Sequence, residues 1–99
     1  SQDMLAANNW NVVQYAVLVH MMAQISGLQA GELIHVIADA HIYDRHIPII
    51  EGLLQKAPRS APLFHIDPSV TDFYQFTRDS FSLEGYDPHP FEEKIPVAV

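Results

Sequence analysis

The longest run of apolar residues in the chain lies between Asn11 and Ser26. This segment contains no proline, and the Ser26-Gly27 pair that ends it is typical of a helix C-terminus. Its apolar residues are distributed so evenly that a helix here has almost no polar face; they are Val12, Val13, Ala16, Val17, Val19, Met21, Met22, Ala23 and Ile25. Because a helix that is apolar on all sides is normally buried, we predict a long buried helix. A chain of 99 residues can hardly surround such a helix, so we expect further polypeptide around it.

The segment Glu32–Tyr43 alternates with a period of two, which is typical of a β-strand. One face of this strand is apolar, and the other carries Asp39, His41 and Tyr43 along its second half. These three side chains would span about 13–14 Å at about 3.3 Å per residue, the width of a small polar ligand. Polar groups in a row are costly to bury unless they line a cavity, but they are ordinary on a solvated edge strand. The pattern therefore predicts a strand that faces either a ligand or solvent.

Shorter elements are predicted after this strand. Asp44 is placed to cap a second helix whose first turn accommodates Pro48. Strands are predicted over 62–66 and 81–86, with a turn and a short helix over 68–76. No repeat, low-complexity run or linker divides the chain. This order of helices and about three strands predicts an α/β (α+β) fold class, with residues 1–99 as a single unit.

Composition and charge narrow the chemistry. The absence of cysteine excludes disulfide bonds, thiolate metal sites and a thiol nucleophile within these residues. Five Lys and Arg against twelve Asp and Glu give a net charge of −7, which argues against a nucleic-acid surface. The apolar stretch Val12–Ile25 is shorter than the roughly 20 residues of a membrane span, and Gln14, His20 and Gln24 interrupt it. We expect a soluble chain that binds neither nucleic acid nor a membrane.

Two polar clusters carry candidate chemistry. Metal-capable side chains are dense between Asp39 and His46, but Asp44 and His46 follow the end of the strand and need not converge with the others. The alternative is that Asp44 caps a helix and His46 packs beside it. In the polar loop before the long helix, which contains Asn8, Asn9 and Asn11, one Asn caps the helix and Trp10 anchors it, or the amide of an Asn reads a base with its adjacent donor and acceptor.

Several motifs occur in order along almost the whole chain. They are Ser1-x-Asp3 followed by Asn11, the run from Tyr15 to Met21, Asp39-Ala40-His41-Ile42-Tyr43 with His46, the run from Glu84 to Pro90, and Pro96-Val97-Ala98-Val99. Together they resemble the C-terminal part of thymidylate synthase. The resemblance implies a partial thymidylate-synthase-type fold in which the strands belong to a larger sheet. It also implies that residues 1–99 are a C-terminal fragment of a single domain from a cytoplasmic, homodimeric methyltransferase.

The reaction implied by the resemblance is the reductive methylation of dUMP to dTMP in nucleotide biosynthesis, with 5,10-methylenetetrahydrofolate as co-substrate and no metal. Ser1 would donate to the nucleotide phosphate, and Asn11 would pair with the uracil edge and stabilise the developing enolate. His41 and Tyr43 would bind the ribose 3′-hydroxyl. A related hydroxymethylase that reads cytosine tends to carry Asp at the position of Asn11, so Asn favours uracil.

On the folate side, the resemblance assigns Asp3 to the folate ring system and Ala98, within the terminal Val97-Ala98-Val99, to a lid that closes over the bound folate. The family's loop before Asn11 usually contains Gly and then Pro-Phe, whereas this chain has Ala7, Asn9 and Trp10. Trp10 retains an aromatic anchor, and Ala7 bears on the backbone conformation of the folate site.

The family's cysteine nucleophile would lie upstream of residue 1, so we expect the 99 residues alone to be inactive. Arg45, Arg59 and Arg78 do not match the family's phosphate-binding arginines, which would come from upstream and from the partner subunit. Two alternatives remain open. One is a noncatalytic module that binds a nucleotide or folate, and the other is a small metal-dependent hydrolase centred on Asp39 to His46.

Overall fold

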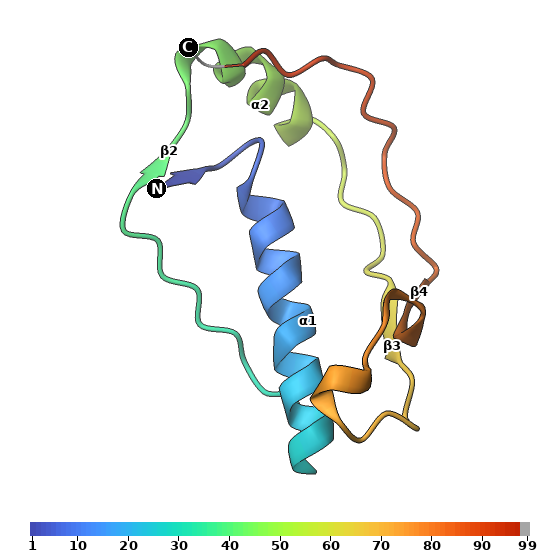
Figure 1. Ribbon diagram of the computed structural model, residues 1–99. Coiled ribbons are helices and arrows are strands. Elements are labelled where there is room, and N and C mark those ends of the chain that lie inside the picture. Colours follow the sequence, from blue (N-terminus) through green and yellow to red (C-terminus); the bar gives the residue numbers. More distant parts are fainter. Residues whose placement is uncertain (98–99) are drawn as a thin grey trace.

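The computed structural model describes residues 1–97. Its elements, in chain order, are β1 (Gln2–Asp3), α1 (Asn8–Ser26), β2 (Ala40–His41), α2 (Ile47–Leu54), β3 (Leu63–Ile66) and β4 (Phe81–Glu84). Three 3₁₀ turns lie at Asp44–His46, Phe73–Gln75 and Arg78–Ser80. Figure 1 shows α1 in the middle of an open frame, whose other elements are joined by extended segments. The predicted α+β class is confirmed, and the order of elements from α1 onward matches the prediction, whereas β1 was not predicted.

The long helix α1 ends where the sequence predicts. Gly27 adopts a left-handed conformation with φ of 69°. In this conformation the backbone N–H of Leu28 donates to the carbonyl of Ala23 over 2.9 Å. Because a left-handed residue is strained with a side chain, glycine is the natural stop here.

The start of α1 differs from the prediction. The helix begins at Asn8, and the cap residue is Ala7, which makes no side-chain capping bond. Ala7 has an ordinary negative φ of −125°, so the loop does not require the glycine usual in the family. The alternative in which an Asn side chain caps the helix is therefore wrong. The expected anchor is also wrong, because the side chain of Trp10 is 77% exposed.

The predicted burial of α1 is not achieved by the residues described. None of the residues of α1 is buried, although the helix is apolar on all sides. The radius of gyration is 16.5 Å, against about 13 Å for a compact chain of this length. The buried apolar side chains of residues 1–97 are Leu5, Ile49 and Val70. The helix therefore has apolar surface that this chain leaves uncovered, as the sequence leads us to expect.

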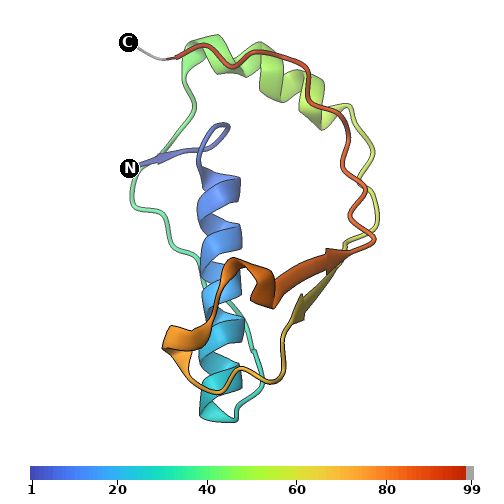
Figure 2. The ribbon, with the colours of Figure 1, turned by 45° about the vertical axis from the view of Figure 1, so that its right-hand side comes forward.

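The strand predicted over Glu32–Tyr43 is much shorter than expected. Only Ala40–His41 pairs, as β2, and it lies parallel to β1. The preceding residues are extended and exposed, with Ile34 82% and Val36 84% accessible. The alternating pattern correctly indicates an extended backbone, but a strand requires a neighbour, and β1 supplies only two residues. Figures 1 and 2 show this segment running from the end of α1 back to β2.

A second small sheet packs beside α1. β3 and β4 form an antiparallel pair in which Phe64 lies opposite Leu83, confirming the strands predicted near these positions. The ring of Phe64 lies 5.1 Å from that of His20 on α1 and 6.0 Å from that of Phe81. Gln24 of α1 donates to the carbonyls of Asp67 and Val70 over 2.8 Å each. Figure 2 shows this hairpin beside the helix.

The second helix begins differently from its prediction. Asp44 does not cap α2; it is the first residue of the 3₁₀ turn Asp44–His46, which leads directly into the helix. Pro48 occupies the first turn of α2, as predicted. No helix within residues 1–97 is both long and apolar enough to cross a membrane.

Candidate functional site

The pairing of β1 with β2 brings together two polar motifs that are far apart in the sequence. The backbone N–H of Gln2 donates to the carbonyl of Asp39 over 2.7 Å, and that of Met4 donates to the carbonyl of His41 over 3.0 Å. In this parallel register Asp3 lies opposite His41. A polar residue from the N-terminal loop and one from the Asp39–Tyr43 motif therefore share one end of the molecule.

Asp3 is held as an ionised acceptor. Its Oδ1 accepts hydrogen bonds from the backbone N–H groups of Leu5 and Ala6, each over 3.0 Å. The bond from Ala6 is the main cause that lowers the pKa of Asp3 below its ordinary value of 3.8. Partial burial opposes this shift, whereas the bond from Leu5 and the imidazoles of His46 and His41 add to it. The chain thus presents a carboxylate in a fixed orientation.

Three aromatic side chains lie beside this carboxylate. The ring of Tyr43 meets that of His41 edge to face at 5.0 Å and that of His46 at 5.5 Å. His46 is the most buried, with 2% of its surface exposed. Its Nε2 lies 2.9 Å from the carbonyl oxygen of Pro96, and its Nδ1 lies 3.9 Å from Oδ1 of Asp3. His46 therefore stands between Asp3 and the C-terminal segment.

Asp3, Tyr43 and His46 border a hollow of about 390 Å³. It is lined by Asp3, Ala6, Tyr43, His46, Ile95, Pro96 and Val97. One side of the hollow is polar, and the C-terminal segment supplies an apolar side. Arg45 adds a second link to this segment, because its Nη1 donates to the carbonyl of Val97 over 2.6 Å. Figure 1 shows the C-terminal segment returning to the start of α2, close to β1 and β2.

The predicted site residues are brought together only in part. Asp3, His41 and Tyr43 gather in one place, although His41 does not line the hollow. Asn11 lies on the first turns of α1, where its Oδ1 accepts from Nε2 of Gln2 over 2.9 Å. Ser1 is exposed, one residue before β1. Ala98 lies outside the described residues.

The Asp39–His46 segment does not converge as a metal site would. Asp39 and His41 are 3.9 Å apart at their closest polar atoms, and Asp39 is well exposed. Within residues 1–97, no group of three or more His, Asp or Glu side chains is placed to hold a metal ion. No contact here favours a metal-dependent hydrolase.

Gln2 and Arg45 take part in this site without having been predicted from the sequence, and the contact of His46 with the C-terminal segment was not predicted either. Gln2 orients the amide of Asn11, and Arg45 and His46 hold the C-terminal segment. The sequence contains a weak signal for His46, which stands three residues after Tyr43 in the quoted motif. No sequence pattern distinguishes Arg45 or Gln2, because their partners lie on other elements.

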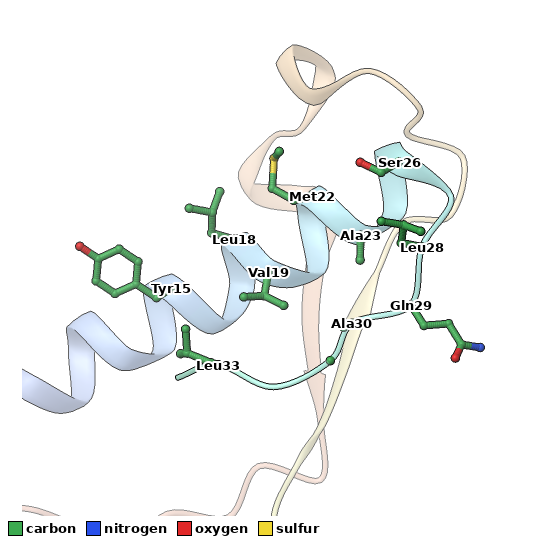
Figure 3. A pocket seen from close by; sticks show the side chains of 11 residues that line it. Tyr15, Leu18, Val19, Met22, Ala23, Ser26, Leu28, Gln29, Ala30 and Leu33 are labelled. Atoms are coloured by element: carbon green, nitrogen blue, oxygen red, sulfur yellow. The ribbon is translucent and has the colours of Figure 1, made fainter. Parts of the chain in front are cut away.

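A second, larger concavity runs along α1 and differs from this site in character. It has a volume of about 420 Å³ and lies between α1 and the segment that follows it. Its lining is apolar, with Leu18, Val19, Met22 and Leu33 among the contributing side chains (Figure 3). It lacks a cluster of titratable groups, so we regard it as part of the uncovered surface of the helix rather than as a site of chemistry.

Comparisons with known proteins indicate the same family over almost the whole chain. The family model described as thymidylate synthase matches residues 1–99. Among solved structures, the thermostable thymidylate synthase A from Bacillus subtilis is similar in fold with a TM-score of 0.94 and 42% sequence identity. The match covers 99% of this chain and 35% of that protein. The chain therefore spans about a third of the length of the protein it resembles.

Proposed function

This chain belongs to the thymidylate synthase family, and on that premise we propose that it forms part of the nucleotide and folate site of an enzyme that converts dUMP to dTMP. The co-substrate would be 5,10-methylenetetrahydrofolate, which supplies both the transferred carbon and the hydride. The acting protein would be a homodimer and would use no metal.

The observation that best supports this proposal is the register of β1 with β2. Opposite pairing of Asp3 and His41 joins two of the motifs on which the resemblance depends. Tyr43, two residues after His41 on the same segment, contacts the rings of His41 and His46. Two motifs that are distant in the sequence thus meet at one site. A chance similarity in only one of the motifs would not explain this meeting.

On the nucleotide side, Asn11 would recognise uracil. The amide of Gln2 donates to Oδ1 of Asn11, which leaves Nδ2 of Asn11 to donate toward O4 of the base. The second lone pair of Oδ1 would accept from N3–H. His41 and Tyr43, whose rings are in contact, would bind the ribose 3′-hydroxyl. Ser1 would donate to the phosphate.

On the folate side, Asp3 would accept hydrogen bonds from the N–H groups of the folate ring system. Its Oδ1 is already occupied by two backbone donors, so the ligand would use the other oxygen. The apolar side of the hollow, formed by the C-terminal segment, would cover the ring. The terminal residues through Ala98 would complete this cover.

The bond-forming chemistry would depend on residues outside this chain. In the proposed reaction a cysteine thiolate adds to C6 of the pyrimidine, and the resulting enolate at C5 attacks the folate methylene. The 99 residues contain no cysteine, so their part is to orient the base and to stabilise the enolate through Asn11. With a net charge of −7, the chain also needs cations from elsewhere to bind a nucleotide phosphate.

The proposed ribose contact can be tested in the complete protein by titration calorimetry. Tyr43→Phe is expected to weaken dUMP binding by about tenfold, because one hydrogen bond is lost. The same variant should bind the 3′-deoxy analogue of dUMP as well as the unsubstituted protein does. Tyr74→Phe is the matched control, since Tyr74 is highly exposed and lies outside the hollow.

If Tyr43→Phe lost affinity equally for dUMP and its 3′-deoxy analogue, the assigned ribose contact would be wrong. If the unsubstituted complete protein did not bind dUMP, the proposed function would be wrong. Binding of dUMP without turnover would instead identify the complete protein as a noncatalytic nucleotide-binding module.

A further inference from the structure

We propose that Arg45 and His46 act as positioning residues that hold the C-terminal segment over Asp3 before any ligand binds. They are consecutive residues of one 3₁₀ turn, and they hydrogen-bond the carbonyls of two consecutive residues, Val97 and Pro96. We call this pair of contacts the tail clamp. The part of the proposal that concerns folate rests on the proposed function above.

The contact from His46 is the inner half of the tail clamp. A backbone carbonyl only accepts, so Nε2 of His46 must carry the proton in its 2.9 Å bond to Pro96. This bond is well protected from solvent, because His46 is 2% exposed. The bond fixes the tautomer of the imidazole. It also fixes the position of the Pro96 carbonyl, which belongs to the apolar side of the hollow.

The other nitrogen of His46 faces Asp3. Nδ1 is buried and has no hydrogen-bond partner within residues 1–97. Its distance of 3.9 Å from Oδ1 of Asp3 is too long for a direct hydrogen bond. The imidazole of His46 thus binds the C-terminal segment directly through Nε2. Its Nδ1 faces the carboxylate of Asp3 but makes no direct hydrogen bond to it.

The contact from Arg45 is the outer half of the tail clamp. Its 2.6 Å bond to Val97 is exposed to solvent and charge-assisted. A hydrogen bond at an exposed position competes with water, so we expect it to contribute less than the bond from His46. Together the two contacts fix the direction in which the chain leaves Pro96.

The consequence of the tail clamp is a pre-formed side of the hollow. Without the tail clamp, the C-terminal segment would have to become ordered when the ligand binds. The loss of conformational entropy would then weaken binding. With the tail clamp, Ile95 and Val97 already border the hollow that contains Asp3. Because the proposed folate contact, Asp3, lies in this hollow, the tail clamp is expected to affect folate more than the nucleotide.

The test uses two variants of His46 in the complete protein. The amide nitrogen of Gln can reach the position of Nε2, whereas that of Asn reaches only the position of Nδ1. His46→Gln should therefore preserve the bond to Pro96, and His46→Asn should abolish it. His89→Asn is the matched control, because Nε2 of His89 also contacts a backbone carbonyl, that of Ala57 over 2.8 Å, but lies away from the hollow.

Two measurements are made on each variant. The first is deuterium uptake, without ligand, of the C-terminal peptide that begins at Phe91, which reports opening of the tail. The second is the KM for 5,10-methylenetetrahydrofolate alongside the Kd for dUMP. We expect His46→Asn to accelerate uptake and to raise the folate KM about tenfold, with the dUMP Kd changed less than about twofold. His46→Gln and His89→Asn should stay within about threefold of the unsubstituted protein in folate KM.

Arg45 is tested in the same assays. Arg45→Gln should accelerate tail uptake to a smaller degree than His46→Asn. Arg59→Gln is its control, because Nη1 of Arg59 also donates to a backbone carbonyl of the C-terminal region, that of Pro88 over 3.1 Å, outside the hollow.

The proposal would be overturned by equal effects of His46→Asn and His46→Gln, or by tail uptake that is unchanged in His46→Asn. A general loss of thermal stability in both variants, without a selective rise in folate KM, would also overturn it and assign His46 a purely structural role. If the tail loosened as expected but the unsubstituted protein showed no activity with folate, the proposed function would fail while the tail clamp would stand.

Discussion

The largest effect that the structure predicts is the loss of cooperative folding when residues 1–99 are separated from other polypeptide. The perturbation is production of this segment alone. The described chain is an open frame around α1, and its buried apolar side chains are few relative to its apolar content of 48%. We expect the isolated segment to retain part of its helix and to lack a single folded state.

The magnitude follows from the exposed surface. The chain exposes 8006 Å², whereas a compact monomer of 11.2 kDa exposes about 5700 Å², so about 2300 Å² is uncovered in excess. If roughly 55–60% of this area is apolar, its burial would contribute about 30 kcal/mol at 25 cal/mol per Å². Domains of this size have a total stability of about 5–15 kcal/mol. The missing burial therefore exceeds the whole expected stability.

The assay is differential scanning calorimetry with far-ultraviolet circular dichroism and light scattering over a range of concentrations. We expect a broad loss of ellipticity without a calorimetric peak. We also expect a mass that rises with concentration, because exposed strand edges and apolar patches associate. The complete protein is the control and should unfold in a sharp transition.

A monomeric segment at every concentration, with a cooperative transition of about 60–80 kcal/mol in enthalpy, would refute this reasoning. Such a result would mean that the uncovered faces of α1 require no partner. The excess exposed area would then not predict instability.

Further predictions concern single residues of the complete protein. Asp3→Asn should raise the KM for 5,10-methylenetetrahydrofolate more than the Kd for dUMP, measured by steady-state kinetics and calorimetry. Because the folded-state pKa of Asp3 is lowered, its charge stabilises the fold above pH about 4, and this contribution is lost as the pH falls through the lowered value. Asp3→Asn should therefore reduce the loss of unfolding free energy at acidic pH, measured by urea unfolding. An unchanged loss at acidic pH would contradict this. Gln2→Glu replaces the donor to Asn11 with an acceptor, so the amide of Asn11 should turn and weaken dUMP binding about tenfold, whereas unchanged affinity would show that Gln2 does not orient Asn11. Gly27→Ala should cost about 1 kcal/mol of unfolding free energy in chemical denaturation, because φ is 69° there, whereas Gly31→Ala should cost little; equal costs would contradict the left-handed helix stop.

The elements that local sequence signals determine were predicted well. The end of α1 at Gly27 follows from the absence of proline before it and the conformational freedom of glycine. The pair β3 and β4 lies where short alternating runs predicted strands. In both cases the decisive interactions lie close in the sequence or within one hairpin.

The elements that depend on distant partners were predicted poorly. The alternation of Glu32–Tyr43 gives an extended backbone, but only Ala40–His41 finds a pairing strand. Trp10 is exposed, and α1 has no buried residue, because nothing in residues 1–97 covers them. Sequence periodicity indicates which surface is apolar but does not supply the chain that buries it.

The candidate site shows the same division. The resemblance to the family assigned Asp3 to folate and His41 and Tyr43 to the ribose, but it did not give their contacts, and no local rule predicts that β1 pairs with β2. The contact between His46 and Pro96 spans 50 residues, and neither residue type indicates it. Long-range contacts of this kind become visible only in the folded structure.

The most direct test of the central claim is the formation of dihydrofolate from dUMP and 5,10-methylenetetrahydrofolate, followed by absorbance. The central claim is that this chain holds the nucleotide and folate but depends on a cysteine supplied from outside its 99 residues. We predict turnover by the complete protein and none by the isolated segment. Turnover by the isolated segment, or no turnover by the complete protein with both substrates present, would contradict the claim.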